Sequence, residues 1–264
     1  MLISTQPGLS DSPSIKAIGT AVPPHKISQE HHYTILESAN GLNRAEKLQL
    51  RKIYSHSGIT SRHSVLEEFG HQDKTGNILF HPSGIEEPVS VSKRMDLYEK
   101  YAADLCIRAV KDCLDKIPSL KCSAITHLVT FSCTGMFAPG LDILLVEKMS
   151  LNRNVERTCI NFMGCYGAFN GLKMADTICK ANPEAKVLVV CVELCTLHFQ
   201  KRMEDDFLLS NALFADGAAA VLIEAKAQNT PQKQLELKSF FCDLYFEGRQ
   251  DMAWNIALLS YLKY

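Results

Sequence analysis

The sequence has no apolar run of about 18 residues, the length that a membrane-spanning helix needs, and its polar first residues lack the apolar stretch of a secretory signal. We therefore expect a cytoplasmic protein without a membrane span. The sequence also lacks a large net charge, because its 28 Lys and Arg residues nearly balance its 29 Asp and Glu residues. Nothing global thus points to nucleic acid as a partner, and no metal-ligand spacing predicts a metal site.

Cysteine is plentiful, with ten residues in 264, but the CxxC pairs typical of metal or redox sites do not occur. Without a secretory signal, reduced thiols are expected rather than disulfides. Most of these cysteines are predicted to be small buried hydrophobic residues. A catalytic cysteine must therefore be distinguished from the others by its position in the chain.

Strand-length apolar runs alternate with helical patterns in the middle of the chain. Apolar residues three and four positions apart predict a helix over 91–114, and further helical patterns occupy 141–150 and 166–181. The apolar runs lie at 125–131, 158–163 and 186–194. This alternation predicts parallel strands joined by right-handed crossovers, so the predicted fold class is α/β. The run VLVVCV shows no polar alternation, as expected for a strand covered on both faces.

The N-terminal part gives weaker signals. Residues 1–14 are predicted to be a flexible tail, and 15–21 a strand that ends at a Pro-Pro turn. Residues 28–53 show a helical pattern with Ser28 as a candidate cap. The His-, Gly- and Pro-rich residues 70–90 predict a loop.

The predicted helix 166–181 has an unusual composition. Gly167, Gly171 and Ala175 recur every four residues and leave one side of the helix almost without side chains. Such a stripe lets another backbone approach closely. The opposite side, which includes Phe169, is apolar, and a helix that is small or apolar nearly all round is expected to be buried. A plain core helix is the alternative interpretation.

Cys165 is the nucleophile candidate. An apolar strand ends at Met163, Gly164 allows a sharp turn, and Cys165 follows at or beside the first position of a helix. The unpaired N–H groups and the dipole of a helix N-terminus favour negative charge, so a lowered pKa and a larger thiolate fraction are expected for Cys165. The same N–H groups can stabilise an oxyanion during acyl transfer. A buried structural cysteine is the alternative.

Five segments, in the same chain order as in the family, resemble the type III polyketide synthases, the chalcone and stilbene synthase family. The segments are CTGMFAPGLD at 133–142, GCYGAFNGLKMA at 164–175, KVLVVCVEL at 186–194, ALFADGAAAVLIE at 212–224 and GRQDMAWNI at 248–256. The resemblance implies the thiolase fold, two related halves stacked as an αβαβα sandwich, and usually a homodimer. It divides the chain into an N-terminal thiolase-like domain over 15–230 and the truncated start of the second half over 231–264.

The resemblance also implies an activity. A starter acyl group moves from an acyl-CoA to the cysteine, and malonyl-CoA is decarboxylated to a carbanion that attacks the thioester. Repeated extension and cyclisation follow. The coenzyme A thioesters are substrates, so no bound cofactor is expected.

Carried onto this sequence, the resemblance makes Cys165 the nucleophile and Phe214 the ring that gates the CoA tunnel and orients decarboxylation, with a core aromatic as the alternative for Phe214. The positions that match the cyclisation cavity are Cys133, Thr134, Cys195 and His198. Cysteine replaces the hydroxyl residues of plant members at two of them, and His198 is bulkier than its counterpart. These departures favour a pyrone or resorcinol, as in bacterial members, over a chalcone. For His198 itself, a satisfied wall histidine is preferred over a catalytic role.

Basic residues on the N-terminal helix and the loop after it are the candidates for CoA phosphates, each with a plain solvated face as the alternative. They are Arg51, Lys52, His56 and Arg62.

The family's catalytic histidine and asparagine have no match here, because the resemblance ends at Ile256. A truncated chain with impaired activity is therefore expected, poorly soluble and able to accept an acyl group without extending it. A chain completed by a second polypeptide and a non-catalytic relic are the alternatives to truncation. An initiating ketoacyl-carrier-protein synthase, which uses a carrier protein, is the alternative enzyme.

Overall fold

The computed structural model describes residues 12–39, 42–69, 89–200, 202, 204–225, 235–249 and 253. Most of the predicted tail and of the predicted loop over 70–90 lies outside the described residues. The same holds for much of the segment over 231–264, including most of the GRQDMAWNI match.

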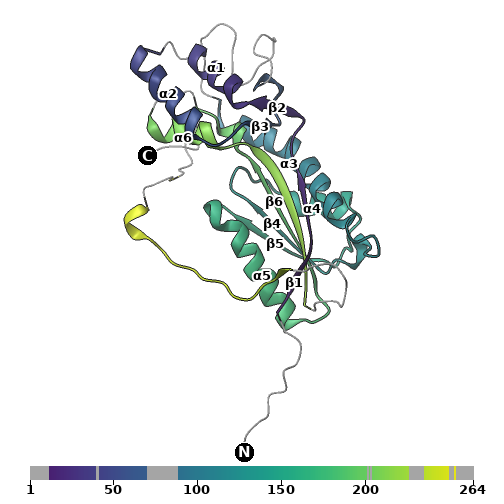
Figure 1. Cartoon of the computed structure of the whole chain (residues 1–264). Coiled ribbons are helices and arrows are strands. Elements are labelled where there is room, and N and C mark those ends of the chain that lie inside the picture. The colour runs from purple at the N-terminus through teal and green to yellow at the C-terminus, as the bar shows by residue number, and fades with distance from the viewer. Residues whose placement is uncertain are drawn as a thin grey trace, which may run out of the picture.

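A six-stranded mixed sheet forms the centre of the molecule, in the order β5-β4-β6-β7-β1-β8 (Figure 1). The strands are β1 Ser14–Ala21, β4 His127–Ser132, β5 Glu156–Asn161, β6 Lys186–Leu194, β7 Asp216–Glu224 and β8 Leu235–Glu236. Strand β4 pairs in parallel with both β5 and β6, which confirms the predicted parallel pairing of these strands. Strand β7 runs antiparallel to β6 and to β1, so the parallel arrangement stops there.

Helices cover both faces of the sheet. Helix α3 (Val91–Leu114) packs on one face with α4 (Leu141–Lys148) beside it, and α5 (Gly167–Ala181) packs on the other (Figure 1). The alternate residues of β6 divide between two clusters of buried side chains, one that contains Leu188 and Val190 and one that contains Val187 and Val189. The prediction that this strand is covered on both faces is confirmed. A fully buried side chain of this size contributes roughly 1.5–3 kcal/mol through burial.

The small residues of α5 face the sheet. A Cβ atom on Gly167 would lie 1.7 Å from the Phe131 ring, and one on Gly171 would lie 2.9 Å from Val189 Cγ1. The stripe therefore lets the helix approach the side chains of β4 and β6 rather than another backbone. The opposite side of α5 is open to solvent, with Phe169 55% exposed. The prediction of a helix buried nearly all round is wrong for the structure described.

A smaller group of elements lies where β6 ends and β7 begins (Figure 1). It contains the hairpin of β2 (His25–Ser28) and β3 (Ser61–Ser64) and the helices α1 (Gln29–Ala39), α2 (Arg44–His56) and α6 (Asp205–Leu213). The single helical pattern predicted over 28–53 is two helices, because Asn43 caps α2 and forms a reciprocal capping box with Glu46. Single 3₁₀ turns complete the described structure: η1 Glu67–Phe69, η2 Cys122–Ala124, η3 Gly164–Tyr166, η4 Cys195–His198 and η5 Phe246–Gly248.

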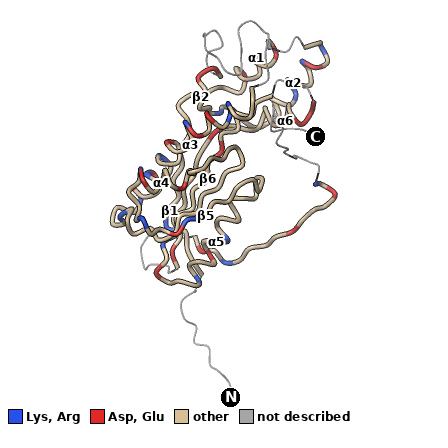
Figure 2. Tube along the Cα trace, turned by 180° about the vertical axis from the view of Figure 1, so that it is seen from behind, with Lys and Arg blue, Asp and Glu red and all other residues tan. Residues whose placement is uncertain are grey.

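Charged residues of both signs are intermixed along the trace (Figure 2), in keeping with the formal net charge of −1. Among the described residues, no helix has the length and apolar character needed to cross a membrane. The described residues also contain no group of three or more His, Cys, Asp or Glu side chains that could hold a metal ion.

Candidate active site

A sharp turn after β5 positions Cys165. Two residues of this turn, Phe162 and Gly164, have φ angles of +57° and +62°. The left-handed conformation costs a residue with a Cβ about 1–2 kcal/mol, and such conformations concentrate at functional sites. The turn leads into η3, where Cys165 is exposed, and η3 continues directly into α5 at Gly167. The predicted order of strand, glycine, cysteine and helix is confirmed, whereas the nucleophilic role stays a prediction.

Three other segments meet the Cys165 turn at the same edge of the sheet. Because β4, β5 and β6 are parallel neighbours, their carboxyl ends share one edge, where ligands of α/β proteins commonly bind. Cys133 follows β4, and η4 with Cys195 follows β6. Antiparallel β7 begins at the same edge, since Asp216 pairs with Leu194.

The thiols of Cys133 and Cys195 lie close enough to Cys165 to respond to its charge. Cys133 Sγ lies 3.7 Å from the Gly164 carbonyl, which joins the loop after β4 to the turn after β5. Burial, followed by the charge of Glu193, raises the pKa of Cys133 and raises that of Cys195 well above its ordinary value. Both cysteines therefore line the site as neutral thiols at pH 7.

Glu193 holds the loop after β4 in place. Its carboxylate accepts hydrogen bonds from the backbone N–H groups of Cys133 at 2.9 Å and Thr134 at 3.0 Å, and from Thr134 Oγ1 at 2.6 Å. Burial raises the pKa of Glu193, and these hydrogen bonds act in the opposite direction. The sequence interpretation missed Glu193, although an acidic residue near the end of an apolar strand could have indicated it.

His198 forms part of the wall of the site. Its Nε2 atom donates to the Thr134 carbonyl at 2.6 Å, because a carbonyl can only accept. Burial lowers the pKa of His198 to about 4, and the nearby Arg94 charge acts in the same direction. A buried imidazole that is neutral and bonded to backbone agrees with the preferred interpretation of His198 as a wall residue.

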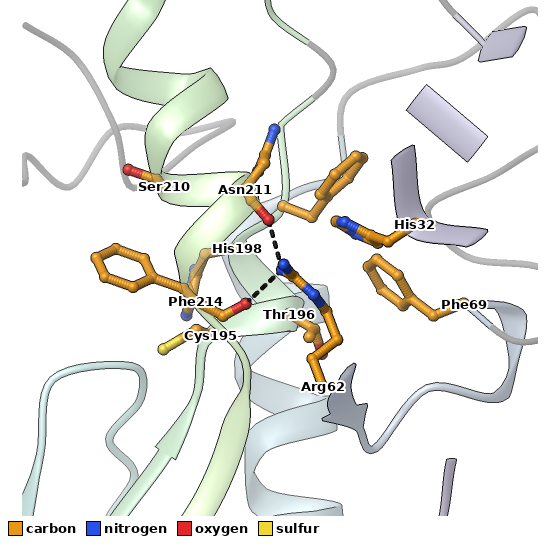
Figure 3. Close-up of a pocket in the computed structure, with 10 residues that line it drawn as sticks. His32, Arg62, Phe69, Cys195, Thr196, His198, Ser210, Asn211 and Phe214 are labelled. Atoms are coloured by element: carbon orange, nitrogen blue, oxygen red, sulfur yellow. Dashed lines mark hydrogen bonds between the residues drawn. The ribbon is translucent and has the colours of Figure 1, made fainter. Parts of the chain in front are cut away.

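Phe214 lies in the same small pocket as Cys195 and His198 (Figure 3). It directly follows α6, and its ring points away from Arg62 in this view. The pocket has a volume of about 20 Å³, enough for a water molecule but not for an acyl chain. Phe214, Cys195 and His198 thus line a nearly filled space, whereas Cys133 and Thr134 are not part of its lining.

Arg62 has a different position from the one predicted. Its guanidinium group is buried and donates hydrogen bonds to the carbonyls of Asn211 at 2.5 Å, Ala212 at 2.6 Å and Phe214 at 2.9 Å, and also to the Gln29 side chain. These carbonyls belong to the C-terminal end of α6, where intrahelical partners run out. The prediction that Arg62 binds CoA is therefore corrected: it fixes the end of α6, and with it the position of Phe214.

The three other CoA candidates lie on α2. Arg51, Lys52 and His56 are all exposed, and Lys52 and His56 are four residues apart, so they share one side of the helix. Their accessibility is compatible with phosphate binding, which stays a prediction.

Comparison with known proteins places these observations in a family. Residues 9–227 match the family described as "Chalcone and stilbene synthases, N-terminal domain". The chain is 30% identical over 184 residues to the Mycobacterium tuberculosis protein named alpha-pyrone synthesis polyketide synthase-like Pks18, and 29% identical over 232 residues to bisdemethoxycurcumin synthase from rice. The first alignment covers 70% of this chain and 44% of the relative, and the second covers 86% and 56%.

The same similarity holds for the fold. The crystal structure of the C-terminal type III polyketide synthase domain of Steely1, a type I/III hybrid from Dictyostelium, superposes with a TM-score of 0.80 at 25% identity. This superposition covers 95% of the present chain and 67% of the Steely1 domain. The chain therefore has the fold of type III polyketide synthase domains, the thiolase fold, and it spans about half the length of the curated relatives named above.

Proposed function

The chain belongs to the chalcone and stilbene synthases, and from this membership we propose that it carries the acyl-accepting nucleophile of a type III polyketide synthase. The proposed substrates are a starter acyl-CoA, which acylates Cys165, and malonyl-CoA, which extends the thioester after decarboxylation. The single observation that supports the proposal most strongly is the position of Cys165, an exposed thiol in the turn that leads into α5.

Acyl transfer to Cys165 follows from this position. The thiolate attacks the carbonyl carbon of the acyl-CoA, a new C–S bond forms, and the bond to the CoA sulfur breaks. The CoA thiolate leaves and takes up a proton from solvent. The N–H groups at the start of η3, which begins at Gly164, precede any intrahelical acceptor, so they can stabilise the oxyanion of the tetrahedral intermediate.

The product class is proposed to be a pyrone or a resorcinol. Neutral thiols at positions 133 and 195 lie next to Cys165, and the neutral imidazole of His198 lines a pocket together with Cys195. This lining differs from the hydroxyl residues that the resemblance associates with plant members. The name of the mycobacterial relative, which refers to alpha-pyrone synthesis, supports the same class.

The proposed CoA contacts are Arg51, Lys52 and His56 on α2. A cation near a phosphate forms a charge-assisted hydrogen bond, and all three side chains are accessible. We further propose a cytoplasmic homodimer, which the family resemblance supports.

A non-catalytic interaction subunit is the second candidate. The observation that favours it is the open apolar side of α5, where Phe169 is 55% exposed. Exposed apolar patches of this kind commonly mark protein–protein contacts. This candidate predicts no covalent acyl intermediate.

The donor of the acyl group provides the test. The purified chain is mixed with an acyl-CoA in one sample and with the same acyl group on a carrier protein in another, and released thiol is measured. We expect CoA release that approaches one equivalent, with none from Cys165→Ser at the same time point. Transfer from the carrier protein alone would favour the ketoacyl-carrier-protein synthase, and transfer from neither donor would favour the interaction subunit.

A further inference from the structure

A second cluster of reactive groups lies on the outer side of α5. The strap, defined as residues 235–249, passes this side of the helix (Figure 1). On the strap, Cys242 Sγ contacts the Tyr166 hydroxyl and accepts a hydrogen bond from Lys173 Nζ at 2.9 Å. Tyr166 and Lys173 are seven residues apart, so they lie about two turns apart on one side of the helix.

The two partners of Cys242 favour a thiolate. An ammonium group can only donate hydrogen bonds, and a phenol donates to a charged sulfur, so both stabilise negative charge on Sγ. Lys173, followed by Tyr166, lowers the pKa of Cys242. The reciprocal effects agree, because the contact with Cys242 raises the pKa of Lys173 and of Tyr166. The adjacent carboxylate of Asp243 accepts from the Leu244 N–H at 2.8 Å.

Cys242 is also accessible, since its side chain is exposed and the neighbouring Phe241 is 84% exposed. Cys159 gives a contrast within the same chain. The residue as a whole is exposed, but partial burial of its sulfur raises the pKa of the Cys159 thiol. Reactive cysteines combine exposure with a nearby cation, whereas exposure alone is not enough.

We propose that Cys242 is a redox-sensitive modification site, at which the thiolate held by Lys173 and Tyr166 reacts with peroxides. The sulfur attacks one peroxide oxygen, an S–O bond forms, and the O–O bond breaks. With hydrogen peroxide, the sulfur is oxidised by two electrons to a sulfenic acid, and the second oxygen leaves as hydroxide and is protonated to water. A dithiol reductant restores the thiol. This proposal does not depend on acyl transfer at Cys165.

The test measures sulfenic acid at each cysteine. The full chain with Cys165→Ala is treated with hydrogen peroxide at neutral pH in the presence of dimedone, and labelled peptides are quantified by mass spectrometry. We expect the peptide with Cys242 to be labelled about an order of magnitude faster than the peptide with Cys159. Lys173→Met should slow labelling of Cys242 towards the rate of Cys159, and Lys173→Arg should retain most of it.

Equal labelling of Cys242 and Cys159, or unchanged labelling of Cys242 in Lys173→Met, would overturn the proposal. Tyr166→Phe gives a second measurement, because loss of the phenol should slow labelling in part. Tyr166 is exposed in η3 and Lys173 is half-buried on the outer side of α5, so their variants should keep the circular dichroism spectrum of the parent. Cys159 in each sample controls for peroxide and label concentration.

Discussion

The backbone conformation of its neighbours sets the position of Cys165. Phe162 and Gly164 both adopt left-handed conformations just before η3. A Cβ atom on Gly164 would meet no atom within 4 Å, so glycine is required there for its φ angle of +62° and not for space. The conformation of this one residue therefore sets the direction in which the Cys165 segment leaves β5.

Gly164→Ala tests this placement, with Gly58→Ala as the matched control. Gly58 has a φ angle of +72° and equally open space, but it lies between α2 and β3. Each substitution should lower the free energy of unfolding by about 1–2 kcal/mol, the cost of a Cβ in this conformation. Only Gly164→Ala should slow acylation of Cys165, as followed by CoA release. Equal acylation rates in the two variants would contradict the account.

His198 gives a prediction for acid pH. Its folded-state pKa of about 4 lies below the ordinary 6.5, so the unfolded chain binds a proton first as the pH falls. This group alone should remove about 3 kcal/mol of stability between pH 6.5 and 4. Asp216 acts in the opposite direction, because burial raises its pKa to about 6 and the folded chain takes up that proton first.

A comparison of wild type with His198→Gln separates these effects, since glutamine can still donate to the Thr134 carbonyl. Urea unfolding at several pH values between 7 and 5 should show the stability difference between the two proteins changing in favour of the variant as the pH falls. If the stabilities of the two proteins changed in parallel with pH, His198 would not be responsible for the loss of stability at acid pH.

At the scale of elements, the spacing of apolar residues predicted the helices and strands whose pattern is regular. Helix α3 has the predicted bounds because its apolar positions are regular and Ser90 caps its first turn. Helix α5 and strands β4, β5 and β6 also lie within a few residues of their predicted ranges. The break between α1 and α2 was missed because it depends on one capping residue, Asn43, within a continuous helical pattern.

The candidate site was predicted in part. The strand-to-helix turn at Cys165 is local, so sequence alone revealed it. The buried position of Arg62 was not predicted, because its carbonyl partners on α6 are about 150 residues away in the chain. Glu193 was missed for the same reason, since its partners lie in the loop after β4, about 60 residues earlier. Contacts between distant segments depend on strand order and register, which periodicity does not contain.

Helix α5 approaches the sheet as closely as its glycines allow. Gly167→Ala would place a Cβ atom 1.7 Å from the Phe131 ring, and overpacking of this kind costs about 1–3 kcal/mol. We expect a lower urea midpoint and slower acylation, because the displaced helix moves the Cys165 turn. Adding Phe131→Leu should recover part of the stability relative to Phe131→Leu alone. No coupling in this double-mutant cycle would contradict the packing argument.

At the scale of the whole molecule, the edge of the sheet that carries the candidate site and the outer side of α5 differ in the kinds of residue they present. The edge at which β4, β5 and β6 end gathers the candidate catalytic residues, whereas the outer side of α5 and the strap present an apolar surface. Exposed large side chains there include Phe169 on α5 and Leu244 and Phe246 on the strap. Surfaces of this type favour association.

Phe169→Glu tests whether this surface causes the purified chain to associate. Sedimentation velocity over a range of concentrations should show association in wild type and less of it in the variant. Leu48→Glu is the control, because Leu48 is 70% exposed on α2, away from α5. A wild type that stays monomeric at all concentrations, or an equal effect of the two substitutions, would contradict the prediction.

The location of the acyl group tests the central claim most directly. The chain is incubated with an acyl-CoA, its intact mass is measured, and the adduct is then mapped by proteolysis at low pH, which preserves thioesters. The account predicts an adduct of one acyl group per chain, located on Cys165 and lost in Cys165→Ala. An adduct of equal yield in Cys165→Ala, or one mapped in wild type to another cysteine, would contradict it.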